Sequence, residues 1–240
     1  MMKSRSIAGI VFFAFTLMLC QTATSSAYTV KLGYIEFPPL FSTDENGKSA
    51  GILIDLADKV LTRAGYQWQA ESFPTKRMIQ KLIDGEIHLW IGLSTIPAFE
   101  NTTYIGKSKI MEISLRAYSL GKKPLIGKKE DLNGKSLLIM RGYSYGGLIK
   151  YIEDRANGVN YTKTDNHVAG FKMLQAGHAD YFLDYRMPSE TALKEVKIPD
   201  LTYSEISSFA VYFVVSQKAP DAKKLLEDLE NAYKNMRKAE

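Results

Sequence analysis

The stretch SLLIMRGYSYGGLIKYIED, residues 136–154, joins two apolar segments of different periodicity through a glycine-rich turn. Residues 136–140 form a short apolar run of strand length, whereas residues 147–154 carry apolar side chains at helical spacing. The turn contains GYSYG, a match to the G-x-S-x-G pattern that presents a nucleophilic serine in many hydrolases. The stretch therefore predicts a strand, a turn and a helix, with Ser144 at the turn as a nucleophile or as a binding residue.

The rest of the sequence does not supply the partners that a nucleophilic Ser144 needs. A hydrolase of this class places an acid and then a histidine on later loops at the same sheet edge. Only His167 and His178 follow Ser144, and both precede the last predicted strand and helix. Binding is the better interpretation, because backbone N–H groups at a glycine-rich turn before a helix attract carboxylate or phosphate oxygens.

Strand-like and helix-like segments alternate on both sides of residues 136–154. Alternation of this length predicts an α/β fold with a largely parallel sheet, organised as two units. The first unit has predicted strands at residues 28–34, 67–72 and 87–92 and predicted helices at 52–64 and 75–83. The second adds predicted helices at 168–175 and 188–194 and a predicted strand at 180–183.

Two further extended segments, residues 113–120 and 209–216, lie at the ends of the second unit. They predict a double hinge between two lobes. After the second segment, Pro220 and Asp221 open a helix whose apolar residues recur at helical spacing, and this helix is expected to return to the first lobe. The expected division is a first lobe of residues 28–118 and 206–240 and a second lobe of residues 119–205. The apolar helix residues are Leu225, Leu226, Leu229, Tyr233 and Met236.

The N-terminal residues read as a targeting segment. Lys3 and Arg5 precede an apolar run at residues 7–20 and small residues at 25–27, which predicts a signal peptide of residues 1–27 and export to the periplasm. A lipid anchor at Cys20 is the alternative. Cleavage after residue 27 removes the only cysteine and lowers the formal net charge of +5 by two.

Composition and motifs narrow the classes of partner. The basic residues are spread along the chain without an arginine-rich run between aromatics, so nucleic acid is not an expected partner. The three histidines lack H-E-x-x-H spacing, and neither a P-loop nor a G-x-G-x-x-G after a strand is present. No metal and no cofactor are predicted, and we expect a monomer.

Polar and aromatic residues follow each predicted strand of the first unit. Phe37 follows the first strand, Phe73 and Arg77 follow the second, and Ser94 and Thr95 follow the third. In open α/β units, ligands bind beyond the carboxyl ends of the strands, so these side chains are expected to meet at one crevice for a small polar ligand. Four of these residues have a simpler interpretation as well: packing for Phe37, a turn cap for Ser94 and Thr95, and a solvated helix position for Arg77.

Four short motifs occur in order along the chain and resemble the periplasmic solute-binding proteins of family 3, whose best-known members bind polar amino acids for ABC transporters. The resemblance covers nearly all of residues 28–240 and implies two α/β lobes, joined by two strands, that close over a ligand. The motifs are YIEFPPL at 34–40 with Asn46-Gly47 and GILIDLA at 51–57, RMIQKLIDGEI at 77–87, LNGKS at 132–136 with Arg141-Gly142, and LQAGHAD at 174–180.

The resemblance implies roles for individual residues. Phe37 would stack on the ligand, and hydroxyl groups of both lobes would hydrogen-bond it: Ser94 and Thr95 from the first lobe, Tyr143 and Ser144 from the second. Arg141, Asp184 and Tyr185 complete the expected ligand-binding set.

Two positions depart from the pattern of the amino-acid binders. Where those proteins carry an arginine for the ligand carboxylate, this chain has Phe99 and Glu100. Where they carry an aspartate for the ligand ammonium, it has Tyr185, with Asp184 one residue early and therefore on the other face of a strand. Arg77 is the expected replacement source of positive charge.

The resulting expectation is a periplasmic binding protein for a small polar solute, such as an amino acid or a related organic molecule, with a separate ABC transporter permease or membrane sensor as partner. Two rivals remain open. One is a periplasmic enzyme on the same fold, similar to cyclohexadienyl dehydratase, in which Glu100 acts as a general acid. The other is an interaction protein whose cleft has lost its ligand.

Overall fold

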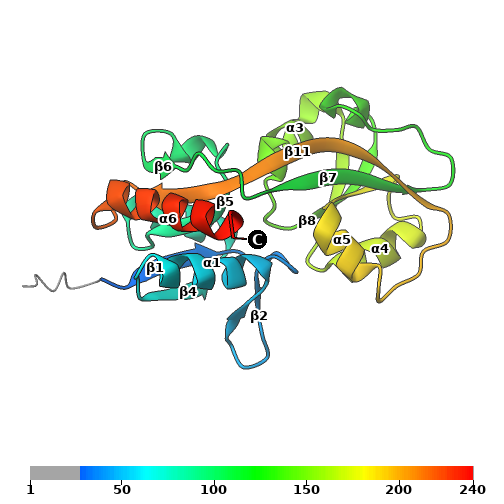
Figure 1. Ribbon diagram of the computed structural model, residues 1–240. Helices are drawn as coiled ribbons and strands as arrows, with labels where there is room; N and C mark the ends of the chain where they lie inside the picture. Colours follow the sequence, from blue (N-terminus) through cyan, green and yellow to red (C-terminus); the bar gives the residue numbers. More distant parts are fainter. Residues whose placement is uncertain (1–27, 240) are drawn as a thin grey trace, which may run out of the picture.

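The computed structural model describes residues 28–239, which form two lobes connected by one continuous curved sheet (Figure 1). The predicted signal peptide and Cys20 lie outside these residues. The strand order in the sheet is β4-β1-β5-β11-β7-β10-β8-β9, with β6 paired to β11 beside this path. The predicted two-lobed α/β fold with two hinge strands is thus confirmed.

The first lobe is built around three parallel strands. β1 (Val30–Tyr34) pairs with β4 (Trp68–Ser72) on one side and with β5 (Leu89–Leu93) on the other. All five residues of β5 are buried, as expected for a parallel strand that is covered on both faces. The covering helices are α1 (Ile52–Arg63), α2 (Thr75–Asp84) and α6 (Ala222–Arg237).

Smaller elements complete the first lobe. The two-stranded hairpin of β2 (Ser42–Thr43) and β3 (Ser49–Ala50) projects from it, and the short strand β6 (Thr103–Ile105) pairs with β11. A 3₁₀ turn, Pro97–Phe99, follows β5.

The second lobe repeats the arrangement on the other side. β8 (Ser136–Met140) pairs in parallel with β9 (Asn160–Thr164) and β10 (Tyr181–Tyr185). Its helices are α3 (Ile149–Glu153), α4 (His167–Gln175) and α5 (Arg186–Ala192). The 3₁₀ turns of this lobe are Lys129–Leu132, Tyr145–Gly147 and Arg155–Asn157.

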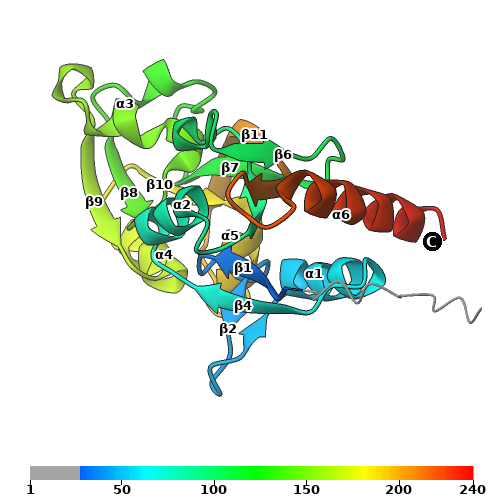
Figure 2. The same cartoon turned by 90° about the vertical axis from the view of Figure 1, so that its left-hand side faces the viewer.

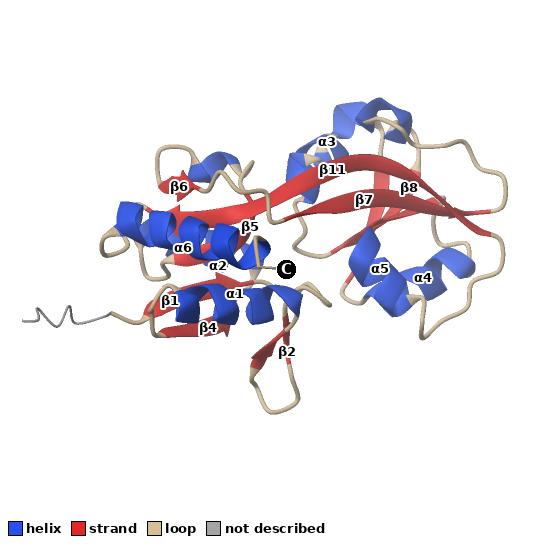
Figure 3. Cartoon of the chain, in the orientation of Figure 1, coloured by secondary structure: helices blue, strands red, loops and turns tan. Residues whose placement is uncertain are grey.

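Two long strands run through both lobes (Figure 3). β7 (Met111–Leu120) and β11 (Leu201–Ser216) are antiparallel to one another; β7 also pairs with β10 of the second lobe, and β11 with β5 of the first. The β7–β11 register shifts between Glu205 and Ser207, which marks an irregularity in the middle of the connection. The lobes are therefore joined by a hydrogen-bonded ribbon rather than by loose chain.

The helix α6 ties the end of the described chain back to the first lobe, where it runs beside α1 (Figure 2). Leu225, Leu229 and Tyr233 of α6 are buried, as its helical spacing predicted. On the same helix, the carboxylate of Glu230 accepts hydrogen bonds from the Ser108 N–H at 3.0 Å and the Ser108 hydroxyl at 2.6 Å. The loop that leads into β7 is thereby fixed to α6.

The predicted elements recur within a few residues of their expected bounds, and the differences have simple causes. β9, with the sequence NYTKT, lies at the sheet edge, is largely exposed and lacks the apolar pattern that reveals a strand. β11 begins at Leu201, whereas the predicted strand begins at residue 209. The prediction missed the first half of the strand because it carries polar residues on a partly exposed ribbon. Among residues 28–239, no helix combines the length and the apolar character needed to cross a membrane.

Candidate ligand-binding cleft

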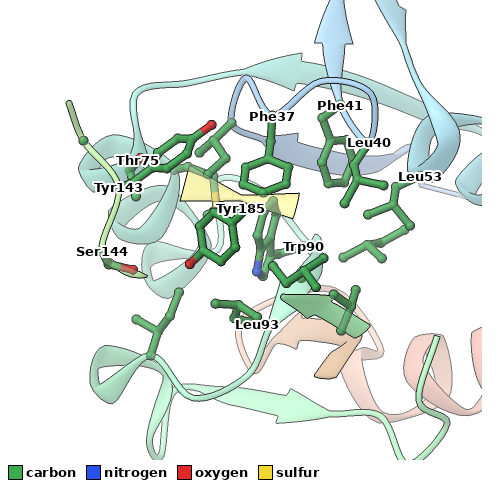
Figure 4. A pocket seen from close by; sticks show the side chains of 18 residues that line it. Phe37, Leu40, Phe41, Leu53, Thr75, Trp90, Leu93, Tyr143, Ser144 and Tyr185 are labelled. Atoms are coloured by element: carbon green, nitrogen blue, oxygen red, sulfur yellow. The ribbon is translucent and has the colours of Figure 1, made fainter. Parts of the chain in front are cut away.

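A cavity of about 70 Å³ lies where the two lobes meet (Figure 4). Its lining comes from the loop after β1, from α1, α2, β5 and the hinge strands, and, in the second lobe, from the turn after β8 and the end of β10. The lining residues are Ile35, Phe37, Leu40, Phe41, Leu53, Thr75, Met78, Trp90, Ile91, Gly92, Leu93, Ile96, Ile113, Gly142, Tyr143, Ser144, Tyr185 and Val211. The lining is therefore dominated by aliphatic and aromatic side chains, and its polar groups are hydroxyls and one indole N–H.

The wall in the first lobe is a column of three aromatic rings. Tyr34 stacks on Phe41 with a centroid distance of 5.5 Å, and Phe41 stacks on Trp90 at 5.6 Å. All three are buried. Stacking of this kind adds about 0.5–1.5 kcal/mol per pair beyond the burial of apolar area, so the column is a rigid wall.

Polar contacts at the base of the column hold it in place. The Tyr34 hydroxyl lies 2.8 Å from the Thr43 hydroxyl, which donates to the Glu36 carboxylate at 2.6 Å. The Ser72 hydroxyl donates to the same carboxylate oxygen at 2.7 Å. The polar side chains nearest the first-lobe wall are thus occupied in fixing the hairpin and the strand ends.

Trp90 and Gly92 sit on the same face of β5, because side chains alternate along a strand. A Cβ placed at Gly92 would come within 2.0 Å of Trp90 Cζ2 and 2.5 Å of its Nε1, so the indole lies flat across the glycine. A side chain at position 92 would displace the ring. Glycine at position 92 therefore leaves the space in which the indole ring of Trp90 lies along the cavity floor.

The two lobes touch through aromatic rings at the cavity. Phe37 of the first lobe stacks on Tyr143 at 5.5 Å and meets Tyr185 edge-on at 5.1 Å. Tyr185 in turn stacks on Tyr145 and contacts Phe209 of the hinge strand β11. The rings of the two lobes are therefore in contact at this cavity, whose volume of about 70 Å³ is below the roughly 300–1,000 Å³ of common ligand pockets.

The GYSYGG turn distributes its residues between the cavity and the core. Tyr143 and Ser144 line the cavity, whereas Tyr145 is buried, accepting a hydrogen bond from the Met140 N–H at 2.5 Å and donating one to the Leu183 carbonyl at 3.1 Å. Gly146 has a φ of 64°, and a Cβ there would lie 2.1 Å from a ring carbon of Phe209. The glycine and Tyr145 therefore serve to seat the turn against β10 and the hinge.

A buried polar chain supports Tyr143 from behind. Its hydroxyl lies 3.5 Å from His167 Nε2, and His167 Nδ1 lies 2.7 Å from Asp184 Oδ2. Asp184 also accepts from the Ser189 hydroxyl and the Tyr185 N–H. Burial raises the pKa of the Asp184 carboxyl, and the hydrogen bond from His167 opposes this rise. Burial also raises the pKa of Tyr143 well above its ordinary value, so its hydroxyl is neutral.

The expected ligand-binding residues divide into two groups. Phe37, Tyr143, Ser144 and Tyr185 meet at the cavity. Asp184 is fully buried and faces His167 and Ser189 instead, as alternation along β10 requires. The other five are not among the lining residues; they are Phe73, Arg77, Ser94, Thr95 and Arg141.

Local geometry explains the positions of those five. Arg77 is exposed on α2, one residue before the buried Met78. Phe73 is buried with the Lys81 ammonium 5.4 Å from its ring, and Arg141 pairs on the surface with Asp165 at 2.5 Å. Ser94 is half-buried and Thr95 exposed after the end of β5.

The chemical rivals find little geometric support at this cavity. Glu100 is exposed and is not among the lining residues. The histidine nearest the turn, His167, directs its free nitrogen to Tyr143 rather than to Ser144. Within residues 28–239, no group of three potential metal ligands gathers at one place.

Sequence reasoning missed Trp90, which the structure places in the cavity floor. The sequence predicts a strand at residues 87–92, which contains Trp90, but assigns the tryptophan no role in ligand binding. A signal was present in the spacing, because tryptophan and glycine two residues apart share one face of a strand, and glycine inside a strand often marks a close approach.

No protein-family model and no curated protein sequence matches the chain. Solved structures match over most of its length. A histidine kinase sensor domain with similarity to periplasmic binding proteins superposes with a TM-score of 0.71 at 20% identity, covering 88% of this chain and 91% of that one. An ancestral arginine-binding protein bound to arginine gives 0.68 at 23% identity, with 88% and 92% covered. The substrate-binding protein of an amino acid ABC transporter gives 0.64 at 17% identity, with 88% and 94% covered. The chain therefore has the two-lobed fold of the periplasmic binding proteins.

Proposed function

We propose that this protein captures a small organic solute between its two lobes and releases it unchanged. The observation that carries the proposal is the cavity itself, which is lined from both lobes and closed by Phe37 against Tyr143 and Tyr185. A ligand that contacts both lobes stabilises the closed arrangement relative to the open one, which is how a two-lobed protein couples binding to a change of shape.

The setting in which capture operates belongs to the same proposal. The structures that this chain resembles include a sensor domain and a transporter substrate-binding protein. We propose a periplasmic location after removal of residues 1–27, and a separate ABC permease or membrane sensor that recognises the closed lobes. The lobe boundaries that we propose, near residues 118 and 205, lie within the ranges of β7 and β11, so the lobes would move about paired strands.

A binding screen tests capture. Purified protein is heated with individual amino acids, organic acids, polyamines and neutral organic solutes, and the unfolding temperature is recorded. A solute present at 100 times its Kd stabilises the folded state by about 2.7 kcal/mol, a shift that this assay resolves. Absence of stabilisation by every solute contradicts the proposal.

A pair of variants ties any binding to the cleft. Ile96 lines the cavity, so Ile96→Trp fills it and should abolish the stabilisation. Ile105 is exposed on β6, so Ile105→Trp adds the same bulk outside the cavity and should leave the stabilisation intact. Equal effects of the two substitutions would place the bound solute elsewhere.

A further inference from the structure

The indole N–H of Trp90 is a buried donor with no hydrogen-bond acceptor among residues 28–239. Trp90 is 6% exposed, and its nitrogen is out of reach of solvent in the closed lobes. Buried N–H groups are almost always paired, so one that is left open inside a ligand cavity calls for an acceptor that the protein itself does not provide.

The position of this N–H is fixed. The indole is stacked on Phe41 on one side and lies across Gly92, so that Nε1 is above the glycine in the cavity floor. Figure 4 shows the nitrogen directed into the cavity, on the side of Tyr185 and Leu93. A donor held in this way is ready for a ligand without rearrangement, which lowers the entropic cost of binding.

The same cavity offers little to a charged ligand. None of its lining residues in the described chain is charged. Of the ionisable residues expected to bind the ligand, Asp184 faces away from the cavity and hydrogen-bonds with His167 and Ser189. Arg141 forms an ion pair with Asp165 on the surface. An ammonium or carboxylate group would lose its water here without gaining an opposite charge, which is strongly unfavourable.

From these observations we infer that the cleft takes an uncharged, largely apolar molecule bearing one hydrogen-bond-accepting group, and that the Trp90 N–H receives that group. The inference rests on the proposed function, since it names the class of solute captured. The sequence predicts a small polar solute. The cavity narrows this class to molecules with a ring or a branched aliphatic body whose only polar group is a carbonyl or ether-like oxygen. The rings of Phe37, Tyr143 and Tyr185 would cover that body.

Two matched pairs of probes test the inference: acetophenone against ethylbenzene, and cyclohexanone against methylcyclohexane. The members of each pair are similar in size, but only the ketone offers an acceptor. We expect each ketone to bind about tenfold more tightly than its hydrocarbon partner, because the hydrocarbon leaves the indole N–H unpaired. L-Phenylalanine, a charged solute with a similar ring, should bind more weakly than acetophenone.

The indole N–H signals provide a direct readout, because the chain has only two tryptophans. In ¹⁵N-labelled protein, the ketones should move the Trp90 signal and leave that of Trp68, whose N–H donates to Asp58 at 3.3 Å on the surface. Trp90→Phe assigns the signal and should abolish the tenfold preference for ketones. Trp68→Phe is the matched control and should keep it.

The outcomes separate this inference from the proposed function. Equal binding of ketones and hydrocarbons overturns the inference, as does tighter binding of L-phenylalanine with an unmoved Trp90 signal; in both cases capture in the cleft still stands. If neither these probes nor the wider screen gives any binding, both fall. Should Trp90→Phe fail to fold, the comparison of paired probes in the unaltered protein still decides.

Discussion

The two walls of the cleft are built on opposite principles. The first-lobe wall is a stack of aromatic rings in which the Tyr34 hydroxyl is hydrogen-bonded to Thr43, whereas Trp90 Nε1, unpaired among the described residues, points at the cavity. The second-lobe wall presents hydroxyl-bearing rings, and behind them the half-buried His167 hydrogen-bonds to the fully buried Asp184. In the first lobe, apolar packing fixes the surface that a ligand meets; in the second, hydrogen bonds behind that surface do so.

The difference assigns separate tasks to the two lobes. A wall with few polar groups selects ligands by shape and by the one group it can pair, because any unpaired polar group is costly to bury. A wall supported by a buried network positions its rings with little freedom, since each member of the network constrains the next. We expect substitutions in the first lobe to change which solute binds, and substitutions in the second to change stability and closure.

The largest effect on stability is expected when the hydrogen bonds behind the second-lobe wall are removed. Asp184→Ala leaves His167, Ser189 and the Tyr185 N–H without their acceptor in the core, and should lower the free energy of unfolding by about 2–4 kcal/mol. Urea denaturation measures it.

Asp165→Ala is the matched control for Asp184→Ala. Asp165 also pairs with a basic residue of this lobe, Arg141, but its side chain is 70% exposed against 0% for Asp184. Its loss should cost less than about 1 kcal/mol. Similar losses in the two variants would show that the buried chain does not support the wall.

The next effect concerns the contact between the walls. Phe37→Leu removes the ring that meets Tyr143 and Tyr185, and should shift the balance between closed and open lobes by about 1–3 kcal/mol toward open. Fluorescence energy transfer between dyes on Lys59→Cys in α1 and Lys172→Cys in α4, in a Cys20→Ser background, reports the separation of the lobes.

Phe171→Leu separates loss of closure from loss of stability. Phe171 is buried inside the second lobe against Phe182, away from the cleft. Its replacement should lower the unfolding temperature while leaving the dye distance unchanged. A dye distance that Phe37→Leu fails to lengthen would mean that the aromatic contact does not hold the lobes together.

A smaller effect is expected at the serine of the turn. Ser144 lines the cavity, so Ser144→Ala should weaken binding of acetophenone by about 0.5–1.5 kcal/mol, the value of one neutral hydrogen bond. Isothermal titration measures it, with the exposed Ser208→Ala of β11 as control. Loss of an esterase activity in the Ser144 variant would instead revive the nucleophile interpretation.

The smallest effect lies at the start of β10, far from either wall. Lys123 and Ser136 hydrogen-bond the Asp180 carboxylate and hold its pKa well below the ordinary range. In unfolded protein this pKa is about 3.9, so the stabilisation is present above about pH 4 and is lost as pH falls toward the folded-state value. The side chain is 39% exposed, so solvent screening limits the contribution to below about 1 kcal/mol.

Asp180→Asn tests this linkage. The variant should be less stable than the unaltered protein at pH 7, and the difference in unfolding free energy should shrink at pH 3. Asp200→Asn, at an exposed turn, is the matched control for the loss of one carboxylate charge. A difference that is constant with pH, or that grows in acid, contradicts the assignment of Asp180 as the titrating group.

Periodicity predicted the fold well because each lobe buries continuous strands between amphipathic helices, and those patterns are local. Strand-end positions predicted Phe37 and Ser144 at the crevice, the family resemblance added Tyr143, and alternation along β10 predicted that Asp184 and Tyr185 face opposite ways. Apart from Tyr143, these features depend only on position within one element.

The remaining errors of placement arise from side-chain direction between elements. Arg77 and Thr75 are two residues apart on α2, yet only Thr75 lines the cavity, because about 100° per residue separates their directions around the helix axis. The role of Trp90 could not be predicted, because its strand is buried on both faces. Only the packing against Phe41 and Gly92 shows which face of the strand belongs to the cleft. A sequence pattern identifies an apolar face but not the partner that it meets.

The return of α6 to the first lobe has a consequence for the order in which the protein folds. The paired strands β8, β9 and β10 of the second lobe all come from residues 136–185. In the first lobe, by contrast, β5 pairs with β11 and Ser108 hydrogen-bonds to Glu230, and both contacts join residues that are far apart in the sequence. Contacts that are distant in sequence form late during synthesis and refolding. We therefore expect amide protons of β8 and β10 to gain protection from hydrogen exchange before those of β5, so that the lobe encoded in the middle of the chain is completed first and the lobe encoded at its beginning is completed last.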